Sequence, residues 1–362
     1  HCTDWLYFRA TGERATDPSE GVFTYGNYRT GAYDDAVLDL LDLGDIAHLR
    51  PDIVDGSKYH APLTNEAAAA VGLVAGTPVV LGPLDVVATT LGAGGYQPGR
   101  NIGISILGST GMHIRIFHDV EDVVISDEQV GYVMPFVVPG TWGGFQSHMA
   151  ATLNIDWLVN LACRFAEAAG LANVDTQDML LRLDRQAADA RPGTLLFHPF
   201  ISENGERGPF VEPKARAQFL GLSSRTGPGD MMRAIYEGMA FAARDCYRAL
   251  DHKPDEIRLA GGAANSAHCR KILAAAVGAP VRIVERAEAG AAGAALMAAV
   301  SIGLYDNIAD GLADWVTSYL GDLEPIDQAL QATYNQLFPA YRDGYRQMGS
   351  IWQALHQSVR GD

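Results

Sequence analysis

The amino-acid sequence predicts an α/β fold made of two domains. Two stretches, residues 77–91 and 257–277, each read as a short apolar run, a turn of small residues and a helix. Between them, residues 101–116 read as two β-rich runs joined by a Gly-rich turn. Strands that alternate with helices form open sheets, which bind ligands at the carboxyl ends of their strands. We therefore expect ligand-binding turns near residues 85 and 261.

Length and composition are those of a globular protein. The chain has 362 residues, of which 48% are hydrophobic and 19% charged, enough for two domains with buried cores. Its 27 Lys and Arg against 43 Asp and Glu leave a net charge of −16, which disfavours nucleic acid and anionic membranes as partners. The four cysteines lack metal-ligand spacing, so a reduced, cytoplasmic protein is expected. Apolar stretches such as 287–300 are shorter than the roughly 20 residues of a membrane helix.

The first domain is expected to cover residues 1–95. It begins with a helix at residues 4–9 that ends at Gly12, passes through a turn at 16–19, and contains an apolar-periodic helix at 36–43. A strand at 78–82 follows, and Asp85 stands between this strand and a helix at 86–91.

The second domain is expected to cover residues 96–362. Strands are predicted at 102–107, 112–116, 257–260 and 281–284. Helices are predicted at 155–169, 176–190, 230–243, from about 266 to 277, and at 289–300.

Two small-residue turns are candidate nucleotide contacts. Gly108-Ser109-Thr110-Gly111 suits phosphate because bare backbone approaches an anion and the hydroxyls add donors, although a plain hairpin turn explains it as well. Gly261-Gly262, ahead of a helix capped by Asn265 or Ser266, could let an adenine lie against backbone, or could be a tight turn only. No Walker phosphate loop occurs in the sequence.

Two further positions are candidates for substrate chemistry. A carboxylate at Asp85 could take a proton from a substrate hydroxyl, while the structural alternative is a helix N-cap. Gln146, in a patch with Trp142 and Phe145, could bind a polyol or could belong to the core. The histidines show no metal-ligand spacing, and no metal-ligating residue is assigned.

A longer segment carries a family resemblance. Ala217-Gln218-Phe219-Leu220-Gly221-Leu222, seven residues, and then Asp230 to Glu237 resemble the second conserved pattern of FGGY carbohydrate kinases. Other stretches are similar to that family in the same order: Asp4-Trp5-Leu6 with Thr11-Gly12, Thr16-Asp17 with Ser19, Gly82 to Asp85, Gly108 to Gly111, Ser202 to Pro209, Gly261 to Ser266, and Glu288 to Ala295. The resemblance implies a two-lobed actin/hexokinase-like (ribonuclease H-like) ATPase fold.

The resemblance also implies an activity and roles. Such a kinase would transfer the γ-phosphate of ATP, with Mg²⁺, to a hydroxyl of a small polyol or ketose, with Asp85 as general base that also contacts substrate. Gly108, Ser109 and Thr110 would contact the ATP phosphates, and Gly261, Gly262 and Asn265 the adenosine. The segment at 142–154 is reminiscent of kinases for erythritol or xylulose-type sugars, and a homodimer is a reasonable expectation for a soluble enzyme.

The front of the chain departs from the family pattern. The family's first strand and its D-x-G-T phosphate loop are not found; Asp42-Leu43-Gly44-Asp45 comes nearest and reads as a helix end. We therefore expect a fragment with an incomplete first lobe, lacking the N-terminal part of the first domain and unable to catalyse alone. Two alternatives stay open: an actin-fold ATPase or nucleotide sensor without a sugar substrate, and a non-catalytic interaction module.

Overall fold

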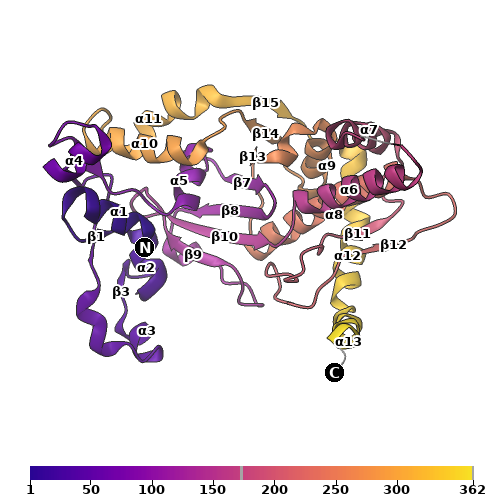
Figure 1. Ribbon diagram of the computed structural model, residues 1–362, viewed down its shortest axis with the longest axis horizontal. Helices are drawn as coiled ribbons and strands as arrows, with labels where there is room; N and C mark the ends of the chain where they lie inside the picture. The colour runs from indigo at the N-terminus through magenta and orange to yellow at the C-terminus, as the bar shows by residue number, and fades with distance from the viewer. Residues whose placement is uncertain (172–173, 361–362) are drawn as a thin grey trace.

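A seven-stranded mixed sheet organises the computed structural model, which describes residues 1–171 and 174–360 (Figure 1). The strand order is β15-β14-β13-β7-β8-β10-β9. The strands are β7 (Ile102–Leu107), β8 (Gly111–Phe117), β9 (Tyr132–Pro135), β10 (Trp142–His148), β13 (Glu256–Ala260), β14 (Val281–Val284) and β15 (Leu320–Glu324). β7, β13 and β14 run parallel, so their carboxyl ends meet at one edge.

Helices cover both faces of this sheet, because its central strands alternate apolar side chains between the two faces. On one face, Ile257 and Leu259 pack with α8 (Pro228–Ala249), α9 (Ala267–Val277) and α12 (Gln328–Arg346). On the other, Ile102 and Ile104 pack with α5 (Asp85–Gly92), α10 (Ala289–Ser301) and α11 (Ile308–Trp315). The result is a three-layer α/β arrangement.

The N-terminal elements gather at one end of the molecule, away from α6 to α9 (Figure 1). The helices there are α1 (Cys2–Thr11), α2 (Pro18–Tyr25), α3 (Asp35–Leu40), the 3₁₀ helix η1 (Gly44–Leu49) and α4 (Asn65–Val71). Short strands pair as β1 (Ala15–Thr16) with β4 (Asp52–Ile53), β2 (Gly26–Asn27) with β3 (Ala32–Tyr33), and β5 (His60–Pro62) with β6 (Pro78–Val80). A small separate core contains Tyr7, Ala15, Ala61 and Leu81.

The opposite end is framed by α6 (Thr152–Ala168), α7 (Thr176–Asp189), the pair β11 (Leu196–His198) and β12 (Gln218–Leu220), and α13 (Gly349–Arg360). Three 3₁₀ helices lie elsewhere: η2 (Val120–Asp122) carries Glu121, which pairs with Arg29 of the N-terminal elements, η3 (Gly262–Asn265) follows β13, and η4 (Thr317–Tyr319) follows α11. α13 carries the C-terminal end of the chain (Figure 1).

Most predicted elements are confirmed within a few residues, including the strand before Asp85 and the hairpin at 102–117. Gly12 closes α1 with a φ of 80°, as expected of a helix-ending glycine. One helix is shorter than predicted: α3 ends at Leu40 because Asp42 turns into the left-handed region at φ 56°, and η1 follows. Asp42 to Asp45 thus lie at the end of a helix, as predicted.

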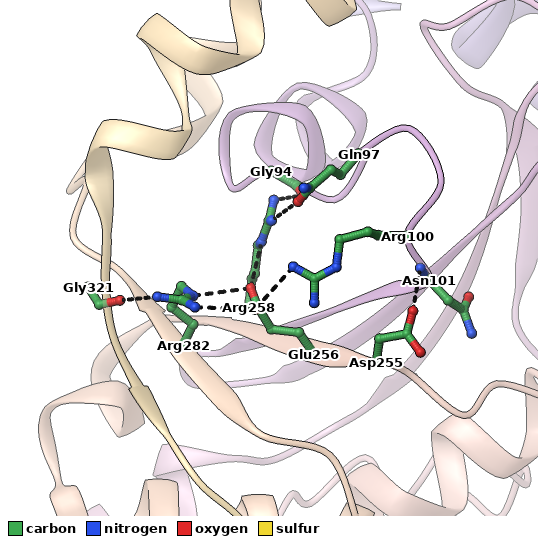
Figure 2. Close-up of polar contacts among 9 residues, drawn as sticks. All are labelled: Gly94, Gln97, Arg100, Asn101, Asp255, Glu256, Arg258, Arg282 and Gly321. Carbon is green, nitrogen blue, oxygen red and sulfur yellow. Dashed lines mark hydrogen bonds and ion pairs between the residues drawn. The ribbon is translucent and has the colours of Figure 1, made fainter.

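Residues 93–101, which join α5 to β7, are fastened to β13 (Figure 2). Arg258 donates hydrogen bonds to the Gly94 carbonyl and to Gln97 Oε1, and its Nε lies 3.2 Å from Glu256 Oε1. At the end of the segment, the Asn101 backbone nitrogen donates to Asp255 Oδ2 at 3.0 Å. α5 itself packs in the core between the sheet and α10, and the predicted domain limit at 95/96 stays a prediction.

Candidate active site

The two predicted glycine turns touch each other at the edge where β7 and β13 end. Ala260 pairs with Ile106 in the parallel ladder, so both strands end side by side. Gly261 has a φ of +95°, and a Cβ there would come within 2.4 Å of the Leu107 carbonyl oxygen and 3.0 Å of the Gly108 nitrogen. Only glycine fits at this contact.

Residues at the start of α6 form hydrogen bonds to the first turn, Gly108–Gly111. The backbone nitrogen of Thr152 donates to the Gly108 carbonyl at 2.9 Å, and its hydroxyl donates to the same oxygen at 3.0 Å. The Ala151 nitrogen donates to the Ser109 carbonyl at 2.8 Å. With both carbonyls held, Ser109 and Thr110 are exposed at the surface of the turn.

A cavity of about 320 Å³ opens beside the second turn. Its lining combines polar and apolar groups: Thr152, Ile155, Asp156, Gln177, Leu180, Leu181, Asp184, Tyr236, Gly262, Ala263, Asn265, Ser266 and Cys269. Its size is within the range of small-molecule sites. Gly262 and Asn265 thus line this cavity, whereas Gly261 makes the contact between the turns. Their predicted contacts with adenosine stay a prediction.

Asp184 is the fixed polar group of this cavity. Its Oδ1 accepts hydrogen bonds from the Tyr236 hydroxyl at 2.8 Å and from the Ser266 hydroxyl at 2.7 Å. Ser266 also caps α9 by accepting from the Cys269 nitrogen. Sequence reasoning missed Asp184 and Gln177, because polar residues of an amphipathic helix read as its solvent face until the helix is docked.

Asp85 is the first residue of α5 and is exposed. Leu84, not Asp85, is the N-cap, and within the part of the chain that the structure describes Asp85 Oδ1 accepts from the adjacent Val86 nitrogen alone, so the alternative of a capping role is wrong. The Asp85 carbonyl oxygen lies 4.0 Å from the position of a Cβ on Gly290, in the first turn of α10. Because α10 follows β14, Asp85 lies beside the edge at which the parallel strands end.

A hydrogen-bonded pair from α2 supports the turn before Asp85. Ser19 Oγ donates to Asp17 Oδ1 at 2.6 Å and accepts from the Leu84 nitrogen at 2.9 Å. Burial raises the pKa of Asp17 to about 7 against the lowering effect of the Ser19 bonds. Sequence reasoning noted Asp17 and Ser19 only as part of the family resemblance and assigned them no role.

Gln146 is buried at 2% exposure. Its amide nitrogen donates to the Val130 carbonyl at 2.8 Å, and its Oε1 is buried without a partner. The nearby Trp142 donates its Nε1–H to the Tyr28 carbonyl at 2.9 Å and so joins the sheet to the N-terminal elements. These contacts give no support for Gln146 as a substrate ligand, and we leave it out of the proposed site.

Across residues 1–171 and 174–360, no three His, Cys, Asp or Glu side chains cluster as metal ligands would. The described helices include none with the length and apolar character needed to cross a bilayer.

Two domain matches cover most of the chain. Residues 1–92 match the N-terminal domain, and residues 104–302 the C-terminal domain, of the FGGY family of carbohydrate kinases. The N-terminal match reaches residue 1, so the expectation that the first part of that domain is missing is not supported. The expectation of a chain unable to catalyse alone stays a prediction.

Individual proteins agree with the domain matches. The chain is 48% identical to erythritol kinase of Brucella abortus (strain 2308) over 355 residues, which cover 98% of this chain and 68% of that protein. It is 30% identical to xylulose kinase of Escherichia coli (strain K12), over 75% of this chain and 52% of that one. The chain thus spans between about half and two thirds of these relatives.

Solved structures resemble the fold. The crystal structure of a ligand-bound xylulose kinase from Lactobacillus acidophilus superposes with a TM-score of 0.83 at 22% identity, over 98% of this chain and 68% of that one. At this level of identity the likeness concerns the arrangement of the chain alone.

Proposed function

Because the chain belongs to the FGGY family of carbohydrate kinases and has the two-lobed actin/hexokinase-like fold of that family, we propose that it phosphorylates a small polyol or ketose with ATP. Erythritol is the first candidate because the erythritol kinase relative is 48% identical, and xylulose is the second. The observation that carries the proposal is the contact between the turns at Gly108 and Gly261, directly beside a cavity of nucleoside size.

The nucleotide would lie across the two turns. Adenosine would occupy the cavity at Gly262 and Asn265, where Asp184 and Gln177 offer polar partners between the apolar Ile155 and Leu180. Its phosphates would lie against Gly108 and the exposed Ser109 and Thr110, whose bare backbone and hydroxyls donate to anions. Mg²⁺ bound to the nucleotide would supply positive charge against its phosphates, in a chain whose own net charge is −16.

Asp85 would act as the general base. Its carboxylate is exposed beside the edge where the turns lie, so a substrate hydroxyl can reach it. It would accept the proton of the substrate hydroxyl as that oxygen attacks the γ-phosphate. In phosphoryl transfer, such positioning and the neutralisation of charge supply most of the catalysis.

The test is ADP release with MgATP against erythritol, other tetritols, pentitols and ketopentoses. We expect one of these to stimulate ADP release, and Asp85→Asn to lower kcat by roughly 10²–10⁴-fold, the usual contribution of a general base, with little change in the affinity for ATP. Wild-type turnover in Asp85→Asn would remove Asp85 from this role. A matched control is Asp119→Asn, which changes an exposed N-capping carboxylate of η2.

An ATPase or nucleotide sensor on the same fold is the second candidate. The exposed Asp85 and the glycine turns would suit it equally, and it would hydrolyse ATP at a rate that no polyol or ketose changes. The same screen separates the two.

The cysteines and the net charge of the chain support a cellular location and a class of partner for the protein. We place the reaction in the cytoplasm, because Cys2, Cys163, Cys246 and Cys269 are all free thiols. A homodimer is compatible with the family, and the acidic net charge disfavours nucleic acid as a partner.

A further inference from the structure

A chain of buried polar side chains runs beneath the turn at Gly108. Ser105 Oγ lies 2.9 Å from the Tyr247 hydroxyl and 3.0 Å from His113 Nδ1. His113 Nε2 lies 3.2 Å from His148 Nε2, and His148 Nδ1 lies 2.8 Å from the Ala150 carbonyl oxygen. Ser105, His113 and His148 are fully buried.

The hydrogen-bond directions in this chain follow from its last member. The Ala150 carbonyl can only accept, so a neutral His148 carries its proton on Nδ1 and accepts at Nε2. His113 must then donate from Nε2 and accept at Nδ1 from the Ser105 hydroxyl, which in turn accepts from Tyr247. Only two neutral imidazoles satisfy this order. Burial favours them, since it lowers the pKa of His113 well below its ordinary value and that of His148 to about 4.

The His148 end of this hydrogen-bonded series contacts the turn at two places. Ala150 precedes Ala151 and Thr152, whose nitrogens hold the Ser109 and Gly108 carbonyls. In addition, the ring of His148 lies against Gly111, the last residue of the turn: a Cβ there would come within 1.9 Å of His148 Nε2. His148 therefore supports the turn from its base and from its far end.

Core packing alone does not explain this arrangement. Apolar side chains would fill the space between β7, β8 and α8 without the desolvation cost of two imidazoles, a serine and a tyrosine. What the polar chain adds is direction, because each group fixes the orientation of the next until the backbone at Ala150 is fixed.

We propose that His148, oriented by His113 and Ser105, is a positioning residue that sets the turn Gly108–Thr110 for the phosphates of the nucleotide. The inference rests on the proposed function, since it assigns the turn to ATP. It makes the phosphate subsite depend on His148 more strongly than the nucleoside cavity, which shares only Thr152 with the residues that hold the turn.

The test compares two ligands by titration calorimetry: the Mg²⁺ complex of a non-hydrolysable ATP analogue, and adenosine. For His148→Leu we expect the Kd of the analogue to rise by about tenfold or more, and that of adenosine to change by less than about twofold. His148→Asn keeps an amide N–H where Nδ1 stood, and should restore most of the affinity. The matched control is His198→Leu, because His198 is equally buried but its ring bonds to the Tyr341 carbonyl and to Gln218, and not to the segment that holds the turn.

Three results decide the matter. The inference is overturned if His148→Leu leaves the Kd of the analogue unchanged. It is also overturned if His148→Leu weakens binding of the analogue and of adenosine alike, or changes the two Kd values in the same ratio as His198→Leu. If His148→Leu does not fold, Ser105→Ala decides instead: it removes one hydroxyl and should weaken the analogue by about threefold without affecting adenosine. If the wild-type protein binds neither ligand, the proposed function fails, and the inference fails with it.

Discussion

Ser19 Oγ accepts a hydrogen bond from the backbone nitrogen of Leu84 at 2.9 Å. The bond joins the first turn of α2 to the residue that precedes Asp85, across 65 positions of sequence. Because Ser19 also donates to the buried Asp17, the start of α5 is tied to a rigid point of the N-terminal elements. The position of the proposed base thus depends on Ser19 and Asp17, which hold the residue before it.

Ser19→Ala should therefore lower turnover through Asp85. The variant loses the acceptor for the Leu84 nitrogen, and we expect kcat to fall by about tenfold, the effect of a modest misplacement, while the KM for ATP changes little. Steady-state kinetics with the substrate found in the screen measures both constants. Thr24→Val, which removes a hydroxyl bonded to the Glu20 carbonyl on the same helix, is the control and should keep wild-type kcat. Equal losses in both variants would refute the link to Asp85.

Asp17 should give the protein a pH-dependent stability. Burial raises its pKa from 3.8 to about 7, so the folded state holds a proton that the unfolded chain releases above about pH 4. The contribution of the protonated Asp17 to stability is fully present below about pH 4 and is lost as the pH rises toward 7. Asp17→Asn keeps the oxygen that accepts from Ser19 and cannot ionise. The free energy of unfolding of this variant, minus that of the wild type, should grow from pH 4 to pH 7, by at most about 1.4 kcal/mol per pH unit, and then level off.

Urea denaturation at several pH values measures this difference. A difference that stays flat across the range would show that Asp17 is ionised in the folded protein. Asp119→Asn is the comparison, because that N-capping carboxylate lies in an exposed stretch.

Gly92 and Gly293 should tolerate no side chain. A Cβ on Gly92 would come within 1.9 Å of the Ala289 carbonyl oxygen, and one on Gly293 within 1.9 Å of the Ala88 carbonyl oxygen. Both obstacles are backbone, so α5 and α10 would have to separate. Gly293→Ala should cost about 1–3 kcal/mol of unfolding free energy, as overpacking does, and Gly92→Ala the same.

Gly349→Ala is the control for these glycines, because nothing lies within 4 Å of its added methyl group. It should leave the thermal midpoint unchanged or slightly raised, since alanine favours a helix. A Gly293→Ala protein as stable as the wild type would show that the helices are not closely packed.

The local parts of the fold could be predicted from the sequence, while its assembly could not. The strand before Asp85, the hairpin around Gly108 and the helix after Gly261 each have a periodicity or a turn residue that acts over a few neighbours. Nothing local records that β7 pairs with β13, more than 150 positions later, with Ile106 opposite Ala260. That register brings the two turns together.

The residues of the candidate site also fall into those that the sequence predicts and those that it does not. Gly108 and Gly261 were predictable because a turn without Cβ atoms is itself a signal. Asp184 and Ser19 were not assigned a role, since an aspartate on an amphipathic helix and a serine near a helix start have ordinary local explanations. Their roles arise from partners supplied by distant segments.

Glu256 should be essential for holding residues 93–101, which connect α5 to β7, against the sheet (Figure 2). Its side chain is 3% exposed and faces three guanidinium groups, at 3.2 Å from Arg258, 3.3 Å from Arg282 and 3.5 Å from Arg100. Burial alone would raise its pKa, but the hydrogen bonds and charges of Arg258 and Arg282 outweigh burial and lower it. The folded pKa is thus below the unfolded one, and the stabilisation is present above about pH 4.3 and lost as the pH falls through the folded pKa.

Glu256→Gln should therefore be strongly destabilising at neutral pH. The variant leaves Arg258, whose side chain is 4% exposed, without a counter-charge while it still holds Gly94 and Gln97. Removing one partner of a buried pair costs about 3 kcal/mol or more. Glu121→Gln removes the partner of Arg29 in a pair that is 49% and 78% exposed, and should cost less than about 1 kcal/mol. If urea denaturation at pH 7 gave the two variants equal stability, residues 93–101 would be held by packing and not by this cluster. A loss confined to Glu256→Gln would instead show that the buried carboxylate keeps α5, and Asp85 at its start, fixed to the sheet.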